Sequence, residues 1–263
     1  MELNVILGPG QRIDAAAAVW VVVDELRASS MLTTALGEGC SEVVVTASLR
    51  RARQLAREDG SLLAGDRDGR RPSGFGLNNS PVQLVAAGPR GRRLVLSTTN
   101  GTAVLSRLQR LPVVLVGCLL NASACAEAAF SEAISRDTGI GILCAGERGR
   151  FALEDAVAGG RIAERILELA AARGAGCRLS DGTRAALRLA AAYPVPGDAL
   201  WGSSTGDLLV SLSAQADIEF CAQVDVSATV PVLRGGNPLR VVPWGPTSPD
   251  QHAMPAGRMG RAG

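Results

Sequence analysis

The sequence predicts an α/β fold with three layers, α/β/α, around a mainly parallel, mixed sheet with extra strands near the C-terminus. Short runs of Val, Leu and Ile alternate with Ala- and Leu-rich segments of helical length. The runs are apolar on both faces, which is typical of parallel strands that helices cover on both sides. The chain has 263 residues, of which 47% are apolar, enough to bury a large core.

Five strand and helix pairs follow one another along the chain. Each strand continues into a helix, with predicted bounds of 18–24 and 27–39, 42–47 and 48–59, 93–98 and 100–110, 112–118 and 121–137, and 139–146 and 151–174. From about residue 208 short apolar runs follow without helices between them, at 207–213, 217–225, 229–236 and 238–244. We expect these four runs to add antiparallel strands at the edge of the sheet.

The chain is expected to form one domain over residues 1–242, with two similar subdomains as an alternative. Residues 243–263 are rich in Pro and Gly and are predicted to be a disordered tail. This tail holds His252, the single histidine. Mechanisms that need an ordered histidine as base or metal ligand are therefore disfavoured.

Composition narrows the location and the partners of the protein. Its apolar runs are shorter than the roughly 20 residues of a membrane-spanning helix, and the N-terminus has no export signal. A net charge of +2 and 3% aromatic residues do not indicate a nucleic-acid-binding surface. None of the six cysteines forms a CxxC pair, which argues against disulfides and structural zinc. We expect a cytoplasmic protein that binds neither membranes nor nucleic acids, and a homo-oligomer remains open.

Polar residues follow three of the predicted strands. Ligands of open parallel sheets bind beyond the carboxyl ends of the strands, where helices present free N–H groups. If the strands run in similar directions, the three turns share one edge and suit a small phosphorylated or sulfonated ligand. Ordinary helix capping requires the same residue types and is the alternative. The three turns hold Asp24, Arg27, Ser29 and Ser30; Ser97, Thr98, Thr99 and Asn100; and Asn121 and Ser123.

Familiar nucleotide and hydrolase motifs are missing. The sequence has no GxxxxGK[ST], no complete GxGxxG and no GxSxG, which disfavours nucleoside triphosphates, dinucleotides and a Ser-His-Asp triad. An arginine cluster at 65–74 is the nearest approach to a basic patch. A solvated loop is the simpler interpretation of this cluster, and anion binding is the other.

Carboxylates indicate a divalent cation. Asp24 directly follows a strand, and the segment 145–160 supplies Glu147, Glu154 and Asp155 after another strand. One or two carboxylates, with water and phosphate oxygens, commonly hold Mg²⁺. Asp24 with Glu154 or Asp155 provides that set. The alternative for Glu154 and Asp155 is that acids in a first helical turn complement the helix dipole.

Five segments together resemble one family. They are VVVDELRASSMLTTAL (21–36), GLNNSPVQL (76–84), LSTTNGT (96–102), CAGERGRFALEDAVAGG (144–160) and DIEFCAQVDVSATVPVL (217–233). Their order and spacing are similar to those of the 2-phosphosulfolactate phosphatase family from about residue 5 to 242. The resemblance implies a Mg²⁺-dependent acid phosphatase that converts a phosphate ester of a sulfonated three-carbon acid to sulfolactate and phosphate, a step of coenzyme M biosynthesis.

The resemblance and the residue patterns together give the expected site. We expect Asp24, Arg27 and Asp155 to be catalytic, and Asp24, Glu154 and Asp155 to bind Mg²⁺. Asp24 either holds the metal or activates the attacking group. The expected substrate-binding residues are Ser29, Ser30, Asn79, Ser80, Thr98, Thr99, Asn100, Gly101, Thr102, Asn121 and Arg148.

Four positions depart from the family pattern. Glu25 replaces an apolar residue, Met31 a small hydroxyl residue, Ala103 a basic residue, and Thr205 a histidine. These departures leave three readings open: the sulfolactate-forming phosphatase, a phosphatase for another small organic phosphate, and a catalytically weak anion-binding protein on the same scaffold.

Overall fold

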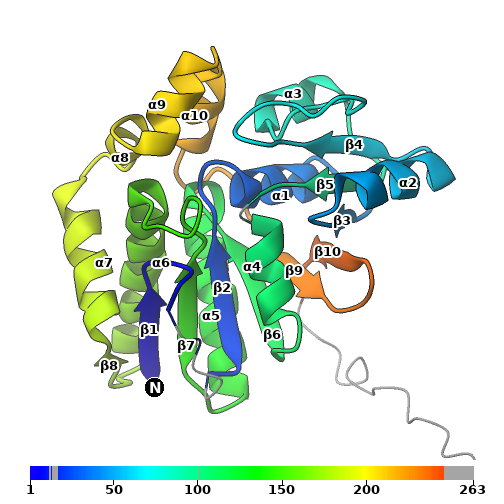
Figure 1. Cartoon of the computed structure of the whole chain (residues 1–263). Helices are drawn as coiled ribbons and strands as arrows, with labels where there is room; N and C mark the ends of the chain where they lie inside the picture. Colours follow the sequence, from blue (N-terminus) through cyan, green and yellow to red (C-terminus); the bar gives the residue numbers. More distant parts are fainter. Residues whose placement is uncertain (12, 14–16, 100, 246–263) are drawn as a thin grey trace, which may run out of the picture.

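The computed structural model describes all residues except 12, 14–16, 100 and 246–263, and in this part of the chain a mixed sheet of ten strands carries helices on both faces (Figure 1). The strand order is β4-β5-β3-β10-β9-β6-β2-β7-β1-β8. The strands are β1 (Glu2–Ile6), β2 (Val19–Val23), β3 (Val43–Val45), β4 (Leu62–Gly65), β5 (Leu94–Ser97), β6 (Val113–Gly117), β7 (Ile140–Cys144), β8 (Arg178–Leu179), β9 (Pro231–Arg234) and β10 (Leu239–Pro243).

The helices confirm the predicted α/β alternation. Every predicted pair of strand and helix is present, with bounds that shift by a few residues. The helices are α1 (Ala28–Gly37), α2 (Leu49–Asp59), α3 (Pro81–Ala86), α4 (Gly101–Leu108), the 3-10 helix η1 (Leu119–Asn121), α5 (Ala122–Ser135), α6 (Leu153–Ala172), α7 (Asp181–Ala192), α8 (Gly197–Trp201), α9 (Ser204–Ser211) and α10 (Gln215–Cys221).

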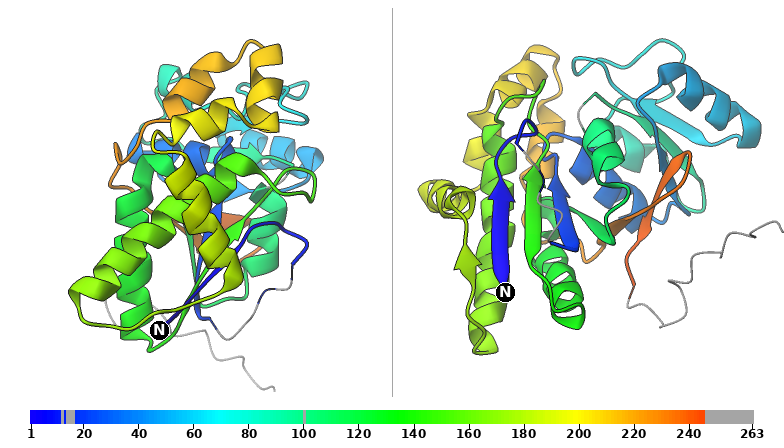
Figure 2. Two further views of the ribbon diagram at one scale, coloured as in Figure 1. Left: turned by 90° about the vertical axis from the view of Figure 1, so that its left-hand side faces the viewer. Right: turned by 60° about the horizontal axis from the view of Figure 1, so that its bottom comes forward.

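Strand β2 shows how the sheet builds a core on each face. All five of its residues are buried. Val19, Val21 and Val23 pack in one cluster with residues of α5, α6 and α7, whereas Trp20 and Val22 pack in another with residues of α1 and α4. Side chains alternate between the faces of a strand, so a strand covered on both sides is apolar throughout. The two helical layers are visible in Figure 2.

The sheet consists of two parallel groups that run in opposite directions. Strands β4, β5 and β3 are parallel to one another, as are β6, β2, β7, β1 and β8. Between the groups, β10 is antiparallel to β3, β9 to β10, and β6 to β9. Three successive reversals leave β5 opposite in direction to β2. The C-terminal strands therefore lie in the middle of the sheet, and their predicted place at its edge is wrong.

Two of the four predicted C-terminal strands are helices. Segments 207–213 and 217–225 form most of α9 and α10. In α10 the buried residues Asp217, Ile218 and Cys221 follow the i, i+1, i+4 spacing of one helical face. The side chain of Ser203 accepts a hydrogen bond from the Gly206 N–H and caps α9. Short apolar runs do not distinguish strand from helix by themselves, which explains the error.

The predicted tail begins too early. Pro243 pairs with Pro231 in the sheet, and the Trp244 N–H donates to the Val230 carbonyl oxygen at 2.7 Å. Residues 246–263, including His252, lie outside the described residues.

All six cysteines are free. Among the described helices, none combines the length and apolar character of a membrane span.

Candidate active site

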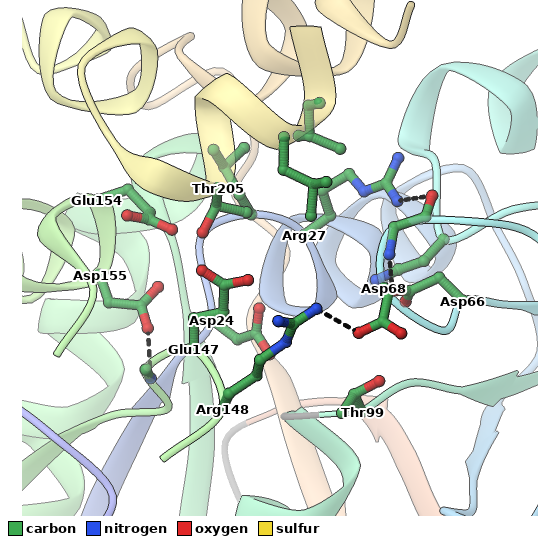
Figure 3. A pocket seen from close by; sticks show the side chains of 16 residues that line it. Asp24, Arg27, Asp66, Asp68, Thr99, Glu147, Arg148, Glu154, Asp155 and Thr205 are labelled. Atoms are coloured by element: carbon green, nitrogen blue, oxygen red, sulfur yellow. Dashed lines mark hydrogen bonds and ion pairs between the residues drawn. The ribbon is translucent and has the colours of Figure 1, made fainter. Parts of the chain in front are cut away.

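A pocket lies where the segments after β2, β4, β5 and β7 meet α6 and α9 (Figure 3). These four strands belong to both halves of the sheet. The expectation that similar strand directions would bring the polar turns together is therefore wrong, because β5 and β2 run in opposite directions. The pocket is lined by Asp24, Leu26, Arg27, Asp66, Asp68, Gly69, Asn79, Thr99, Gly146, Glu147, Arg148, Glu154, Asp155, Thr205, Leu208 and Leu209.

Asp24 lies at the carboxyl end of β2, as predicted, and its side chain is held by the start of the next helix. Its Oδ1 accepts a hydrogen bond from the Ala28 N–H at 3.2 Å, and its own N–H donates to Ser29 Oγ at 2.9 Å. Burial, together with the charges of Asp66 and Glu154, raises the pKa of Asp24 to about 7, although the Ala28 and Gly101 N–H groups oppose the change. Asp24 can therefore gain or lose a proton near neutral pH.

Gly101 lets α4 approach Asp24. A Cβ atom at this position would lie 2.8 Å from Asp24 Oδ2 and 2.7 Å from the Ala28 Cβ. Only glycine fits without displacing the carboxylate. The glycine of the LSTTNGT segment thus permits a backbone N–H to face Asp24 from the other half of the sheet.

Glu154 and Asp155 occupy the first turn of α6 and are 2% and 3% exposed. Asp155 joins two turns, since its Oδ1 accepts from the Glu25 N–H at 2.7 Å and its Oδ2 from the Gly146 N–H at 2.8 Å. Burial raises the pKa of both carboxyl groups, and for Asp155 the charges of Glu154 and Asp24 add to this. The hydroxyl groups of Thr205 and Ser203 lower the pKa of Glu154 in part. Glu154 and Asp155 also complement the helix dipole from the first turn of α6, as the alternative interpretation predicts.

Arg27 lines the pocket and is anchored behind it. Its Nη1 donates to Asp217 Oδ2 at 2.6 Å, and its Nη2 to the Gly69 carbonyl oxygen at 3.3 Å. Ser80, the N-cap of α3, donates to the other Asp217 oxygen at 2.6 Å. Ser80 is thus a partner of the Arg27 anchor and is not among the pocket-lining residues.

Arg148 is placed at an exposed part of the pocket. Its Nη2 pairs with Asp68 Oδ1 at 2.6 Å, and both side chains are more than half exposed. Figure 3 shows this ion pair and, on the other side of Asp24, the carboxylates of Glu154 and Asp155. Of the remaining predicted substrate-binding residues, Asn79 and Thr99 also line the pocket.

Several predicted substrate-binding residues serve the fold instead of lining the pocket. Ser29 and Ser30 bind the turn after β2, and Thr98 and Thr102 bind each other across the start of α4. Asn121 is fully buried, and its amide group binds Cys118, Thr33, Val116 and Thr229. Capping and turn bonds thus account for these polar groups. The prediction for Asn100 lies outside the described residues.

Sequence reasoning missed Asp66 and Asp68. Asp66 directly follows strand β4, just as Asp24 directly follows β2. In the segment 65–74 these two acids stand among arginines, which give the segment the sequence pattern of a basic cluster. The side chains of Arg67 and Arg71 bind backbone carbonyl groups of nearby turns, whereas the acids line the pocket. Thr205 also lines the pocket, at the position where the family resemblance had indicated a histidine.

The donor set fits a hard divalent cation. Six carboxylates and only two guanidinium groups line the pocket, and oxygen ligands of this kind suit Mg²⁺. Within the described part of the chain, no three His, Cys, Asp or Glu side chains converge closely enough to hold a metal ion by themselves. Asp24, Glu154 and Asp155 therefore do not form a complete three-carboxylate cluster. One or two of these carboxylates would bind the cation, and water and phosphate oxygens would complete its coordination.

A second groove continues from the pocket. It shares Glu147, Arg148, Glu154 and Thr205 with the pocket and extends along Arg150 and Phe151 to the start of α9. The side chain of Phe151 is 51% exposed. Two arginines and two glutamates line this groove, and Arg150 is the guanidinium group that the groove adds to those of the pocket.

Comparison with known proteins agrees with the resemblance noted in the sequence. The family model described as 2-phosphosulpholactate phosphatase matches residues 9–236. A probable 2-phosphosulfolactate phosphatase of Thermus thermophilus is 39% identical over 89% of this chain and 95% of its own length. Proteins of the same description from Deinococcus radiodurans and Thermotoga petrophila are 36% and 34% identical, over 90% and 89% of this chain and 95% and 96% of their own lengths. The chain belongs to the 2-phosphosulpholactate phosphatase family.

Proposed function

We propose that this protein is a Mg²⁺-dependent phosphatase that hydrolyses 2-phosphosulfolactate to sulfolactate and inorganic phosphate. The observation that carries the proposal is the convergence of the family's separate segments on one pocket, where Asp24, Asn79, Thr99 and Glu154 lie together. The names of the relatives, each a probable 2-phosphosulfolactate phosphatase, support the substrate.

The charge of the pocket supports the need for a cation. Carboxylates outnumber guanidinium groups, so a phosphate ester would be repelled unless bound cations or protons neutralise them. A bound Mg²⁺ would neutralise charge on the phosphoryl oxygens. Asp24 with Glu154 or Asp155 would hold it. Arg27, Arg148 and Thr99 would orient the anionic groups of the substrate, because donors placed at fixed positions stabilise charge that develops during phosphoryl transfer.

Asp24 is the residue proposed to hold the metal or to accept a proton from the attacking water. In the overall reaction water adds to phosphorus, the bond from phosphorus to the ester oxygen breaks, and the ester oxygen gains a proton to become the hydroxyl group of sulfolactate. With a pKa of about 7, Asp24 can accept the water's proton at a carboxylate oxygen near neutral pH. The adjoining groove with Arg150 would hold the sulfonate.

Phosphate release by the purified protein tests the proposal. We expect Mg²⁺-dependent release that is strongest with 2-phosphosulfolactate in a panel with 2-phospholactate, phosphoglycerate and p-nitrophenyl phosphate. Asp24→Asn should abolish turnover and keep the melting temperature near that of the parent, because the amide has the same shape as the carboxyl group.

Each other result has a definite meaning. Preference for another ester would change the substrate, and no release from any ester would favour an anion-binding protein. Activity retained by Asp24→Asn would contradict the role of Asp24.

A further inference from the structure

Two acceptor oxygens of the pocket have no donor. Asp66 Oδ1 and Asn79 Oδ1 are buried, and neither has a hydrogen-bond partner among the described residues. Both residues line the pocket, and Asn79 is 4% exposed. Buried polar groups nearly always have a hydrogen-bond partner. Two buried oxygens without one in the same pocket therefore indicate that a ligand binds there. A ligand that satisfies acceptors must be a donor or a cation.

The backbone around these oxygens is braced. Asp66 Oδ2 accepts from the Gly69 N–H at 3.2 Å, and the Gly69 carbonyl oxygen accepts from Asn78 Nδ2 at 2.9 Å. Asn78 Oδ1 in turn accepts from the Asn79 N–H at 2.8 Å. This chain of bonds links the segment after β4 to the start of α3. The two unpaired oxygens are therefore held in place by the loop itself.

The local charge selects a cation. Arg27 pairs with Asp217, and Arg148 pairs with Asp68. Asp24 lies between Asp66 on one side and Glu154 on the other, as Figure 3 shows. A neutral donor would leave this negative charge uncompensated, whereas a divalent cation would satisfy both oxygens and reduce the repulsion. Carboxylate and amide oxygens are the ligands that Mg²⁺ and Ca²⁺ prefer.

We propose that Asp66 and Asn79 hold a divalent cation on the β4 side of the pocket, separate from the cation proposed at Asp24 with Glu154 or Asp155. Asp24 lies between Asp66 and Glu154. Paired metal ions of this kind stabilise the attacking and leaving oxygens in many phosphatases and nucleases. This second position rests on the proposed function, to whose metal site it adds, and the protein should bind the cation there without substrate.

Titration of the metal-free full-length protein with Mn²⁺ tests the inference, with free Mn²⁺ measured by electron paramagnetic resonance. We expect two bound Mn²⁺ per chain in the parent and one in Asp66→Asn. Asp68→Asn is the matched control, because it removes the same charge from the same pocket two residues away. If attraction by charge alone held the metal, Asp68→Asn would weaken binding as much as Asp66→Asn, and this result would overturn the inference.

Asn79→Asp provides a gain of binding that misfolding cannot imitate. A carboxylate in place of the amide should bind Mn²⁺ at this position about tenfold more tightly, since affinity rises with the charge of the ligands. Unchanged or weaker binding by Asn79→Asp would overturn the inference.

Glu154→Gln separates this inference from the proposed function. If the parent binds a single Mn²⁺ that Asp66→Asn loses and Glu154→Gln keeps, the Asp66 position is supported and the Glu154 position is contradicted. The reverse result overturns the inference and leaves the proposed function intact. The titration contains no phosphate ester, so its result does not depend on activity.

Discussion

The buried ion pair between Arg27 and Asp217 allows a quantitative prediction. The side chains are 2% and 5% exposed, and Arg27 Nη1 lies 2.6 Å from Asp217 Oδ2. The change Asp217→Asn keeps the shape of the side chain but removes its charge, and it leaves the guanidinium group buried without a counter-ion. Breaking such a pair on one side costs about 3–5 kcal/mol.

The expected loss lies at the lower end of that range. Arg27 keeps its hydrogen bond to the Gly69 carbonyl oxygen, and an amide oxygen can still accept from Ser80. For a chain of this length a loss of about 3 kcal/mol lowers the melting temperature by roughly 6–12 °C. Differential scanning fluorimetry of the metal-free protein measures this shift.

A surface pair provides the control for this measurement. Glu2→Gln removes the same charge from the exposed pair with Arg178, where solvent screens the interaction, so the melting temperature should not change. The double variant Arg27→Gln with Asp217→Asn should be no less stable than Asp217→Asn alone, because it removes the uncompensated charge. An Asp217→Asn protein that melts within about 2 °C of the parent would refute the argument that this pair is buried and coupled.

Three further predictions concern pH, the groove and the approach of α4. Burial raises the pKa of Asp24 to about 7 and of Glu25 to about 8, so the folded metal-free protein holds protons that the unfolded chain releases near pH 4. The stability that these two groups contribute is fully present below pH 4 and is lost as the pH rises through 7 to 8. The melting temperature in EDTA should therefore fall between pH 5.5 and 8.5, and a rise over this range would contradict the prediction. Arg150→Gln should raise the KM for 2-phosphosulfolactate about two- to fivefold. The KM for 2-phospholactate should not change, because this ester lacks the sulfonate. Equal effects on both esters would exclude a contact between Arg150 and the sulfonate. Gly101→Ala should destabilise the protein by about 1–3 kcal/mol, because its Cβ would meet Asp24 and Ala28, while Gly176→Ala, which has open space, should not.

The parallel part of the fold could be predicted because its signals are local. The run Val19–Val23 is apolar on both faces and is followed by Asp24, which predicts a buried strand with an acid at its carboxyl end. The first turn of α6 presented Glu154 and Asp155 in the same way. The positions of these acids are confirmed because the apolar pattern and the residue that follows it are both local features of the sequence.

The sheet reversal could not be predicted from local patterns. Strands β9 and β10 insert between β3 and β6, and this pairing depends on segments separated by more than a hundred residues. Asp66 was missed because the preceding strand β4 has only four residues, and the first two, Leu62 and Leu63, are partly exposed. The role of Asn121 was misjudged because a buried amide that binds backbone groups has the same sequence signature as one that binds an anion.

The reversal explains why residues so far apart in the chain form one pocket. Strands β2 and β6 are parallel neighbours, so the turns after them lie at one edge, yet Asn121 after β6 does not line the pocket. Instead, Thr99 after β5 and Asp66 after β4 face Asp24 from the oppositely directed half. Each half thus brings carboxylates from its own strand ends, and the pocket collects acids that repel one another. Protons or cations between the halves reduce this repulsion, so proton release and metal binding should be coupled in this protein.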